Sequence, residues 1–165
     1  MIVIGIDPGL DGAIAAVAAD SLTTGTYLVE DMPTVLLGKT GRRMVAVQVL
    51  ADLFWRLVDA GAERPHVVIE NVHAMPRQGV ASMFSMGRTL GAIEGVAGAL
   101  KSPIHYVEPR AWKRYYNIGS DKEESRAVAL QRFPGLAAAL ARKKDHGRAE
   151  ALLITRYWLE RGASL

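Results

Sequence analysis

The stretch MIVIGIDPGLDG, residues 1–12, combines a buried strand with a carboxylate where that strand ends. Residues 2–6 are apolar and mostly β-branched, which favours a strand covered on both faces. Asp7 ends the run, and Pro8 and Gly9 then turn the chain. A carboxylate at the exit of a buried strand is costly unless something outside the core uses it. We therefore predict a strand over residues 2–7 with a functional Asp7, and a simple turn-forming role for Asp7 is the alternative.

Two further acidic residues stand at comparable boundaries. Glu70 closes the apolar run Val67–Ile69, and Glu150 opens the apolar run Ala151–Ile154. Glutamate is a poor turn former, so a functional role for Glu70 is favoured over a structural one. If the three carboxylates converge in the fold, they form a site for a divalent metal ion. Such a site suits metal-assisted cleavage of a phosphodiester.

The order of predicted elements gives an α/β fold class. We expect three antiparallel strands, then helix, strand, helix and strand, and finally three helices: strands 2–7, 13–18, 26–30, 67–70 and 104–107, helices 42–60, 80–100, 109–116, 121–132 and 146–161, and loops 33–41 and 75–79. This order predicts a mixed sheet with helices on its faces. The first and fourth strands then lie side by side, and Asp7 and Glu70 emerge at the same edge.

The composition narrows the class of protein. A length of 165 residues predicts a single domain over residues 1–165. The net charge is +3, and from Lys101 to Arg161 there are 13 Lys or Arg against 7 Asp or Glu, which favours contact with phosphates. The absence of cysteine excludes disulfides, thiol nucleophiles and Cys-ligated zinc. With no apolar run that could span a bilayer, we expect a soluble intracellular protein without a membrane partner.

The segment before Glu150 leaves one question open. His146 and Glu150 are four residues apart and share a helical face, whereas Asp145 and Glu150 diverge if both are helical. Asp145 can instead be the N-cap of the helix. His146 can bind metal, orient a water or protonate a leaving oxygen. Asp145 and His146 therefore compete for the place beside Glu150, and both are candidate catalytic and metal-binding residues.

Three motifs together resemble the RuvC-type Holliday junction resolvases, of the ribonuclease H-like superfamily. They are IGIDPGLDG at 4–12, VIENV at 68–72 and KDHGRAEAL at 144–152, and the last is most similar to the phage and organellar branch. The resemblance covers nearly the whole chain in the same order. It implies a ribonuclease H-like five-stranded mixed sheet of strand order 3-2-1-4-5, with helices on both faces.

The resemblance also implies an activity and partners. The family cuts four-way DNA junctions by paired nicks in recombination and repair, as a homodimer with Mg²⁺, for which Mn²⁺ substitutes. By position, Asp7, Glu70 and Glu150 match three of its metal-binding acids. Its bacterial members carry a fourth ligand at the place of Gly147, which cannot ligate. A cytoplasmic location in a bacterial or phage-infected cell, or an organelle, is expected.

Cationic residues and one loop are the expected DNA contacts. Lys113 and Lys122 fall where the family keeps basic residues, and the loop 71–79 matches the segment that probes the junction, although no Phe stands at its start. The full set of expected DNA-binding residues is His73, Met75, Arg77, Lys113, Arg114, Lys122, Lys143, Lys144 and Arg148. A solvated charged surface is the structural alternative for the basic residues, and core packing is the alternative for Met75.

The helix expected over residues 80–100 carries Gly87, Gly91 and Gly95 at four-residue spacing. Small residues at that spacing form one smooth helical face. This face is either a dimer interface or a surface buried against the protein's own sheet.

Three rival functions fit parts of the pattern. One is a ribonuclease H-like nuclease that acts on flaps or RNA–DNA hybrids. Another is a protein that binds junctions or branched DNA without cleaving them. The third is a phosphotransferase of the actin and sugar kinase type, which needs two such domains and a second phosphate loop.

Overall fold

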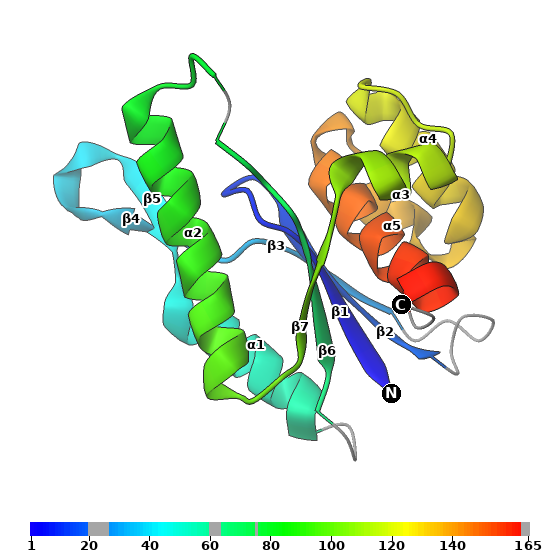
Figure 1. Ribbon diagram of the computed structural model, residues 1–165, viewed down its shortest axis with the longest axis horizontal. Coiled ribbons are helices and arrows are strands. Elements are labelled where there is room, and N and C mark those ends of the chain that lie inside the picture. The colour runs from blue at the N-terminus through cyan, green and yellow to red at the C-terminus, as the bar shows by residue number, and fades with distance from the viewer. Residues whose placement is uncertain (20–26, 60–63, 75, 163–165) are drawn as a thin grey trace.

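The computed structural model describes residues 1–19, 27–59, 64–74 and 76–162. In chain order the elements are β1 (Ile2–Asp7), β2 (Ala13–Ala18), β3 (Tyr27–Asp31), β4 (Thr34–Leu37), the 3₁₀ turn η2 (Gly38–Thr40), β5 (Arg42–Val45), α1 (Val47–Asp59), β6 (His66–Glu70), α2 (Val80–Ala99), β7 (Ile104–Val107), α3 (Pro109–Tyr115), α4 (Lys122–Arg132), the 3₁₀ segments η3 (Pro134–Leu140) and η4 (Lys143–Asp145), and α5 (His146–Arg161). Figure 1 shows a central sheet with α1 and α2 on one side and α3, α4 and α5 on the other.

The five-stranded sheet has the predicted topology. Its spatial order is β3-β2-β1-β6-β7. Because β6 and β7 are the fourth and fifth strands of this sheet in chain order, this is the predicted order 3-2-1-4-5. β1 pairs antiparallel with β2 and parallel with β6, and β6 pairs parallel with β7. The mixed sheet with helices on both faces is therefore confirmed.

Side-chain alternation along the strands divides the core into two layers. Val3 and Val68 pack under α3, α4 and α5 with Trp112, Leu152 and Trp158. Ile4, Ile6 and Ile69 pack under α1 and α2 with Leu50, Phe54 and Ile93. Because successive strand residues point to opposite faces, Asp7 and Glu70 belong to the same face as Val3 and Val68. The alternation of side chains along the two strands therefore places both carboxylates on the face that α5 covers.

The segment 33–45 departs from the sequence prediction. Residues 33–41 were expected to be a loop and the following helix to begin at Arg42, but β4 and β5 form an antiparallel hairpin and α1 begins only at Val47. Val45 matched the helical spacing of Val49 and Leu53, yet it is a strand residue buried in the core. The hairpin forms a separate two-stranded sheet beside α2 (Figure 1).

The later helices agree closely with the prediction. α2, α3 and α4 begin or end within one residue of the expected bounds, and α5 spans the predicted residues 146–161. Among the helices of the described ranges, none is both long and apolar enough to cross a membrane. Nearly every residue in the middle of α5 is buried, so this helix forms the centre of its layer.

Candidate metal and catalytic site

Three carboxylates from distant parts of the chain meet at one edge of the sheet. Ile6 pairs with Ile69 in the parallel register, so Asp7 and Glu70 follow side by side on adjacent strands. Glu150 lies one turn into α5, the helix that covers this face. The negative charges of Glu70 and Glu150 both act on Asp7, and Glu150 also acts on Glu70. The predicted convergence of the three acids is thus present in the described residues.

Small residues let α5 come close enough to bring Glu150 to the strands. A Cβ atom on Gly5 would lie 2.7 Å from the carbonyl oxygen of Ala151 and 2.8 Å from the backbone nitrogen of Thr155. At the start of the helix, a Cβ on Gly147 would lie 2.8 Å from the carbonyl oxygen of Asp11. These contacts leave no room for a side chain at either glycine. The chain therefore cannot place a fourth ligand at residue 147 without moving the helix.

Asp7 experiences the strongest electrostatic perturbation in the site. Burial, followed by the negative charges of Glu150 and Glu70, raises the pKa of its carboxyl group to about 7. The backbone N–H of Gly9 and the ammonium group of Lys122 act in the opposite direction. A cation bound close to this carboxyl group would favour its ionised form. Clustered acids of this kind are typical of functional sites.

Glu70 is held by a tryptophan. The indole Nε1–H of Trp112, which is fully buried in α3, donates a hydrogen bond of 3.0 Å to Oε1 of Glu70. Burial raises the pKa of Glu70, and this hydrogen bond lowers it because it favours the ionised form. The interaction fixes the side chain and leaves the second oxygen, Oε2, without a hydrogen bond to Trp112.

Two lysines lie beside the carboxylates. Nζ of Lys113 is 3.8 Å from Oε1 of Glu150, and the hydroxyl of Ser125 donates a 3.2 Å hydrogen bond to the same oxygen. Lys122, at the start of α4, has its Nζ 3.0 Å from Nε2 of His146. Both lysines therefore stand at the edge of the acidic cluster, where they can contact an anionic substrate.

Asp145 and His146 lie in different environments, the first buried and the second partly exposed. The carboxylate of Asp145 is 2 % exposed and accepts hydrogen bonds from the backbone N–H and the guanidinium group of Arg142. These bonds hold the pKa of Asp145 below its usual range. Asp145 precedes α5 as its N-cap residue, but its side chain bonds back to Arg142 and does not cap the helix. His146 is only partly buried and lies beside Lys122.

The expected DNA-binding residues are distributed unevenly. Arg77, Arg114, Lys122, Lys143 and Lys144 are exposed, and Lys113 is partly exposed. His73 faces Glu108 at 3.6 Å, while Arg148 forms an ion pair with Asp31 in which the Nε–Oδ1 distance is 2.6 Å. Met75 lies outside the described residues. Binding of DNA by these side chains stays a prediction, and Arg148 already has a role in joining α5 to β3.

The donor atoms fit a hard divalent cation. Asp7, Glu70 and Glu150 offer only carboxylate oxygens, which Mg²⁺ and Mn²⁺ prefer. Within the ranges that the structure describes, no three acidic or histidine side chains already stand in an arrangement that holds an ion. The mutual repulsion that raises the Asp7 pKa is the force that a bound cation would relieve.

The raised pKa of Asp7 predicts how the metal-free protein responds to pH. The folded carboxyl group, with a pKa of about 7, holds its proton where the unfolded one, with a pKa of 3.8, has lost it. The free energy of unfolding should therefore fall as pH rises from about 4 to about 7, by about 4 kcal/mol. Urea denaturation in chelator at several pH values measures this fall. Asp7→Asn should flatten the curve, and an unchanged pH dependence in that variant would contradict the assignment.

Introducing an acidic residue at position 147, where the sequence has Gly, should destabilise the protein. The side chain in Gly147→Asp would collide with the backbone of Asp11 and Gly12, which cannot rotate away. We expect a loss of about 1–3 kcal/mol in the free energy of unfolding, with reduced activity and no gain in metal affinity. Denaturant titration and isothermal calorimetry with Mn²⁺ measure both quantities. Gly135→Asp, at a glycine with open space around it, is the control.

Sequence reasoning missed three residues that shape this site. Trp112 donates a hydrogen bond to Glu70, 42 residues away in the sequence, and Ser125 donates one to Glu150, 25 residues away. Arg142 forms an ion pair with Asp145. The first two contacts depend on how α3 and α4 pack, so no local pattern indicates them. The third had a signal, since Arg142 and Asp145 are three residues apart and can form a short-range ion pair.

Comparison with known proteins relates the chain to junction resolvases. No family model matches it. The chain is 33% identical, over 134 residues, to the chloroplastic Holliday junction resolvase MOC1 of Chlamydomonas reinhardtii; the match covers 75% of this chain and 14% of that protein. The chain thus spans about a seventh of the length of this curated relative.

Solved structures show the same fold. The structure of Thermus thermophilus RuvC matches with a TM-score of 0.60 at 18% identity, covering 98% of this chain and 97% of that one. T. thermophilus RuvC in complex with a Holliday junction substrate matches with a TM-score of 0.63 at 20% identity, covering 98% and 96%. In sequence the chain is similar to a Holliday junction resolvase, and its fold is similar to that of RuvC.

Proposed function

We propose that this protein is a metal-dependent endonuclease that resolves four-way DNA junctions by paired nicks. The observation that carries the proposal is the meeting of Asp7, Glu70 and Glu150 at the carboxyl edge of the parallel strands, with Lys113 and Lys122 beside them. Acids that hold cations and lysines that hold phosphates are the two parts that phosphodiester hydrolysis needs. The similarity to a chloroplastic junction resolvase and to RuvC points to branched DNA as the substrate.

The three carboxylates are the proposed ligands for Mg²⁺, with Mn²⁺ as a substitute. Bound in this way, the metal would supply Lewis acidity and an activated water at neutral pH. Trp112 fixes Glu70 so that Oε1 is occupied and Oε2 is available, and Ser125 restrains Glu150 through Oε1. The chain thereby orients two of its three acids before substrate arrives, which reduces the reorganisation needed for reaction.

The fourth catalytic position is better assigned to His146 than to Asp145. Arg142 donates hydrogen bonds to both carboxylate oxygens of Asp145. If Asp145 turned away from Arg142 to bind a metal ion, it would lose this ion pair. His146 lies beside Lys122, whose charge acts on Asp7. His146 can therefore hold or donate a proton at the scissile group, while Lys122 and Lys113 contact the phosphate oxygens.

A homodimer with two such sites is part of the proposal, and α2 supplies its proposed interface. Gly87, Gly91 and Gly95 are exposed, and a Cβ atom on any of them would meet nothing within 4 Å. They are therefore not buried against the protein's own sheet, which was the alternative. Gly91→Arg should yield monomers that nick junctions singly and without pairing, as sedimentation and a cruciform plasmid cleavage assay would measure.

Incubation with a labelled immobile four-way junction tests the proposal. We expect symmetric paired nicks with Mg²⁺ and none with chelator. Flap, RNA–DNA hybrid and plain duplex substrates of the same arm length are the controls. Preference for a flap or hybrid would favour a different nuclease, and binding without nicking would favour a junction-binding protein. The proposed location is the cytoplasm or an organelle, and the chloroplastic relative supports the second of these.

A further inference from the structure

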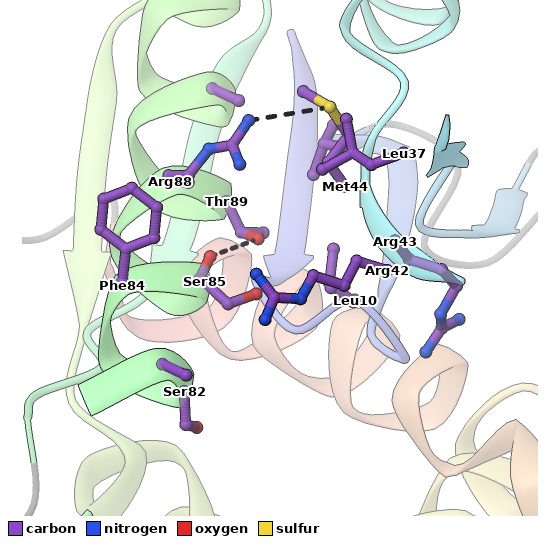
Figure 2. Close-up of a pocket in the computed structure, with 13 residues that line it drawn as sticks. Leu10, Leu37, Arg42, Arg43, Met44, Ser82, Phe84, Ser85, Arg88 and Thr89 are labelled. Atoms are coloured by element: carbon purple, nitrogen blue, oxygen red, sulfur yellow. Dashed lines mark hydrogen bonds between the residues drawn. The ribbon is translucent and has the colours of Figure 1, made fainter. Parts of the chain in front are cut away.

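A groove separate from the acidic cluster lies between α2 and the β4–β5 hairpin. It encloses about 580 Å³ and is lined on one side by Ser82, Ser85 and Arg88 of α2. Leu37, Arg42 and Met44 of the hairpin line the other side. Figure 2 shows the side chains of Arg42 and Arg88 extending into the space between the helix and the hairpin. None of the residues assigned above to metal or DNA binding takes part in this groove.

The groove is cationic. Three arginines and no acidic residue line it. Arg43 is neutralised by Asp11, whose Oδ1 lies 2.6 Å from its Nη2. Arg42 is exposed, and Arg88 makes only a weak 3.7 Å contact with the sulfur of Met44 and a 5.8 Å approach to the ring of Phe84. Neither contact neutralises a guanidinium charge, so two cations face the same cavity.

The groove also borders the turn that follows Asp7. Leu10, which lines it, lies three residues after Asp7 in the turn between β1 and β2. The Arg43–Asp11 ion pair fastens the hairpin to that same turn. The groove and the acidic cluster therefore share the β1–β2 turn as a common border.

Phe84 adds an apolar contact at the margin of the groove. Its side chain is 67% exposed although it is a large aromatic residue. Exposed aromatic rings beside arginines are typical of surfaces that bind nucleic acid, because sugars and unstacked bases pack on the ring while guanidinium groups hold phosphates. The hydroxyl groups of Ser82 and Ser85 add neutral donors for phosphate oxygens.

We propose that this groove binds the phosphate backbone of a DNA strand that continues from the catalytic centre, with Arg42 and Arg88 as its phosphate contacts. The proposal rests on the proposed nuclease function for the identity of the ligand. Its residues come from α2 and from the hairpin outside the five-stranded sheet, so it enlarges the DNA-binding surface beyond α3 and α4. A partner protein is disfavoured, because two unpaired arginines at the centre of a protein interface are costly to desolvate.

Measurement of binding in chelator separates this groove from catalysis. The Arg42→Ala/Arg88→Ala protein is compared with wild type for affinity to a labelled four-way junction over a series of salt concentrations. We expect roughly a tenfold or greater weakening near 0.1 M salt and a slope of log affinity against log salt that is shallower by about two. Arg56→Ala/Arg64→Ala is the matched control, with two exposed arginines outside the groove and no expected change. Equal affinity and slope in the groove variant and wild type would overturn the proposal.

A footprint gives a second readout that does not depend on the arginine variants folding well. The chain has no cysteine, so Ser82→Cys introduces a unique thiol in the groove, and Arg56→Cys introduces one on α1. DNA should slow maleimide labelling at residue 82 at least fivefold and leave labelling at residue 56 unchanged. Equal labelling with and without bound DNA at residue 82 would overturn the groove.

The two proposals fail in different ways. If wild type binds the junction but never nicks it, the nuclease proposal fails and the groove is still tested by affinity and footprint. If wild type nicks the junction while the groove variant keeps its affinity and residue 82 is unprotected, only the groove fails. Protection of residue 82 by a second copy of the chain, seen without DNA as the protein concentration rises, would show a protein interface and contradict the proposal.

Discussion

Asp7→Asn should reduce the rate of junction cleavage by roughly 10³-fold or more, equal to about 4 kcal/mol of transition-state stabilisation. Asp7 is the central member of the acidic cluster, since both Glu70 and Glu150 act on its carboxyl group. Asparagine has nearly the same shape but loses the anionic oxygen that a divalent cation requires. Single-turnover cleavage at saturating Mg²⁺ measures the effect.

Binding of the junction by the same variant should be retained or slightly strengthened. Removal of one negative charge lowers the repulsion between the site and DNA phosphates. Asp52→Asn, an exposed acid on α1, is the control that should leave both cleavage and binding unchanged. Undiminished cleavage by Asp7→Asn would refute the assignment of the catalytic site.

Trp112→Ala should cost about 3–5 kcal/mol of the free energy of unfolding, the largest stability effect that we expect in this chain. Trp112 is 0% exposed and packs in the layer that contains α5, so its loss leaves a large cavity. It also removes the hydrogen bond to Glu70. Denaturant unfolding measures the loss, and Trp55→Phe, at a tryptophan that is 49% exposed, should change stability by no more than about 0.5 kcal/mol.

Trp112→Phe separates packing from the hydrogen bond. The ring is retained, but no N–H reaches Glu70, so the pKa of Glu70 should rise further above its usual value. The acidic limb of the pH–rate profile should then move to higher pH. A folded Trp112→Phe protein with an unmoved profile would show that the hydrogen bond has no part in holding Glu70 ionised.

The five-stranded sheet and the three acids were predictable because both depend on local patterns. Apolar runs that end in an acid marked β1 and β6, and the crossover rules for parallel strands placed Asp7 beside Glu70. Glu150 was found because an acid preceded an apolar helical segment within a motif that resembles a known family. In each case the informative residues are adjacent in the sequence.

The hairpin and the support of the site were not predictable in this way. Pro33, Gly38 and Gly41 suggested a loop, and Val45 fitted a helical spacing equally well, so short-range signals favoured the wrong elements. The order of preference between Asp145 and His146 depended on whether Arg142 turns back on Asp145. The three-residue spacing permits that contact, but the spacing alone does not show that it forms. The Trp112–Glu70 contact depends on tertiary packing and has no sequence signature.

The position of Glu150 on α5 also determines when, during synthesis and folding, the three acidic residues come together. Asp7 and Glu70 are synthesised early, but they lack their third acid until the final helix has docked on the sheet through Gly5 and Gly147. Because domains are made from the N-terminus onward, nascent or truncated chains without this helix lack one of the three proposed metal ligands. Docking of α5 is therefore the step that completes the proposed metal site.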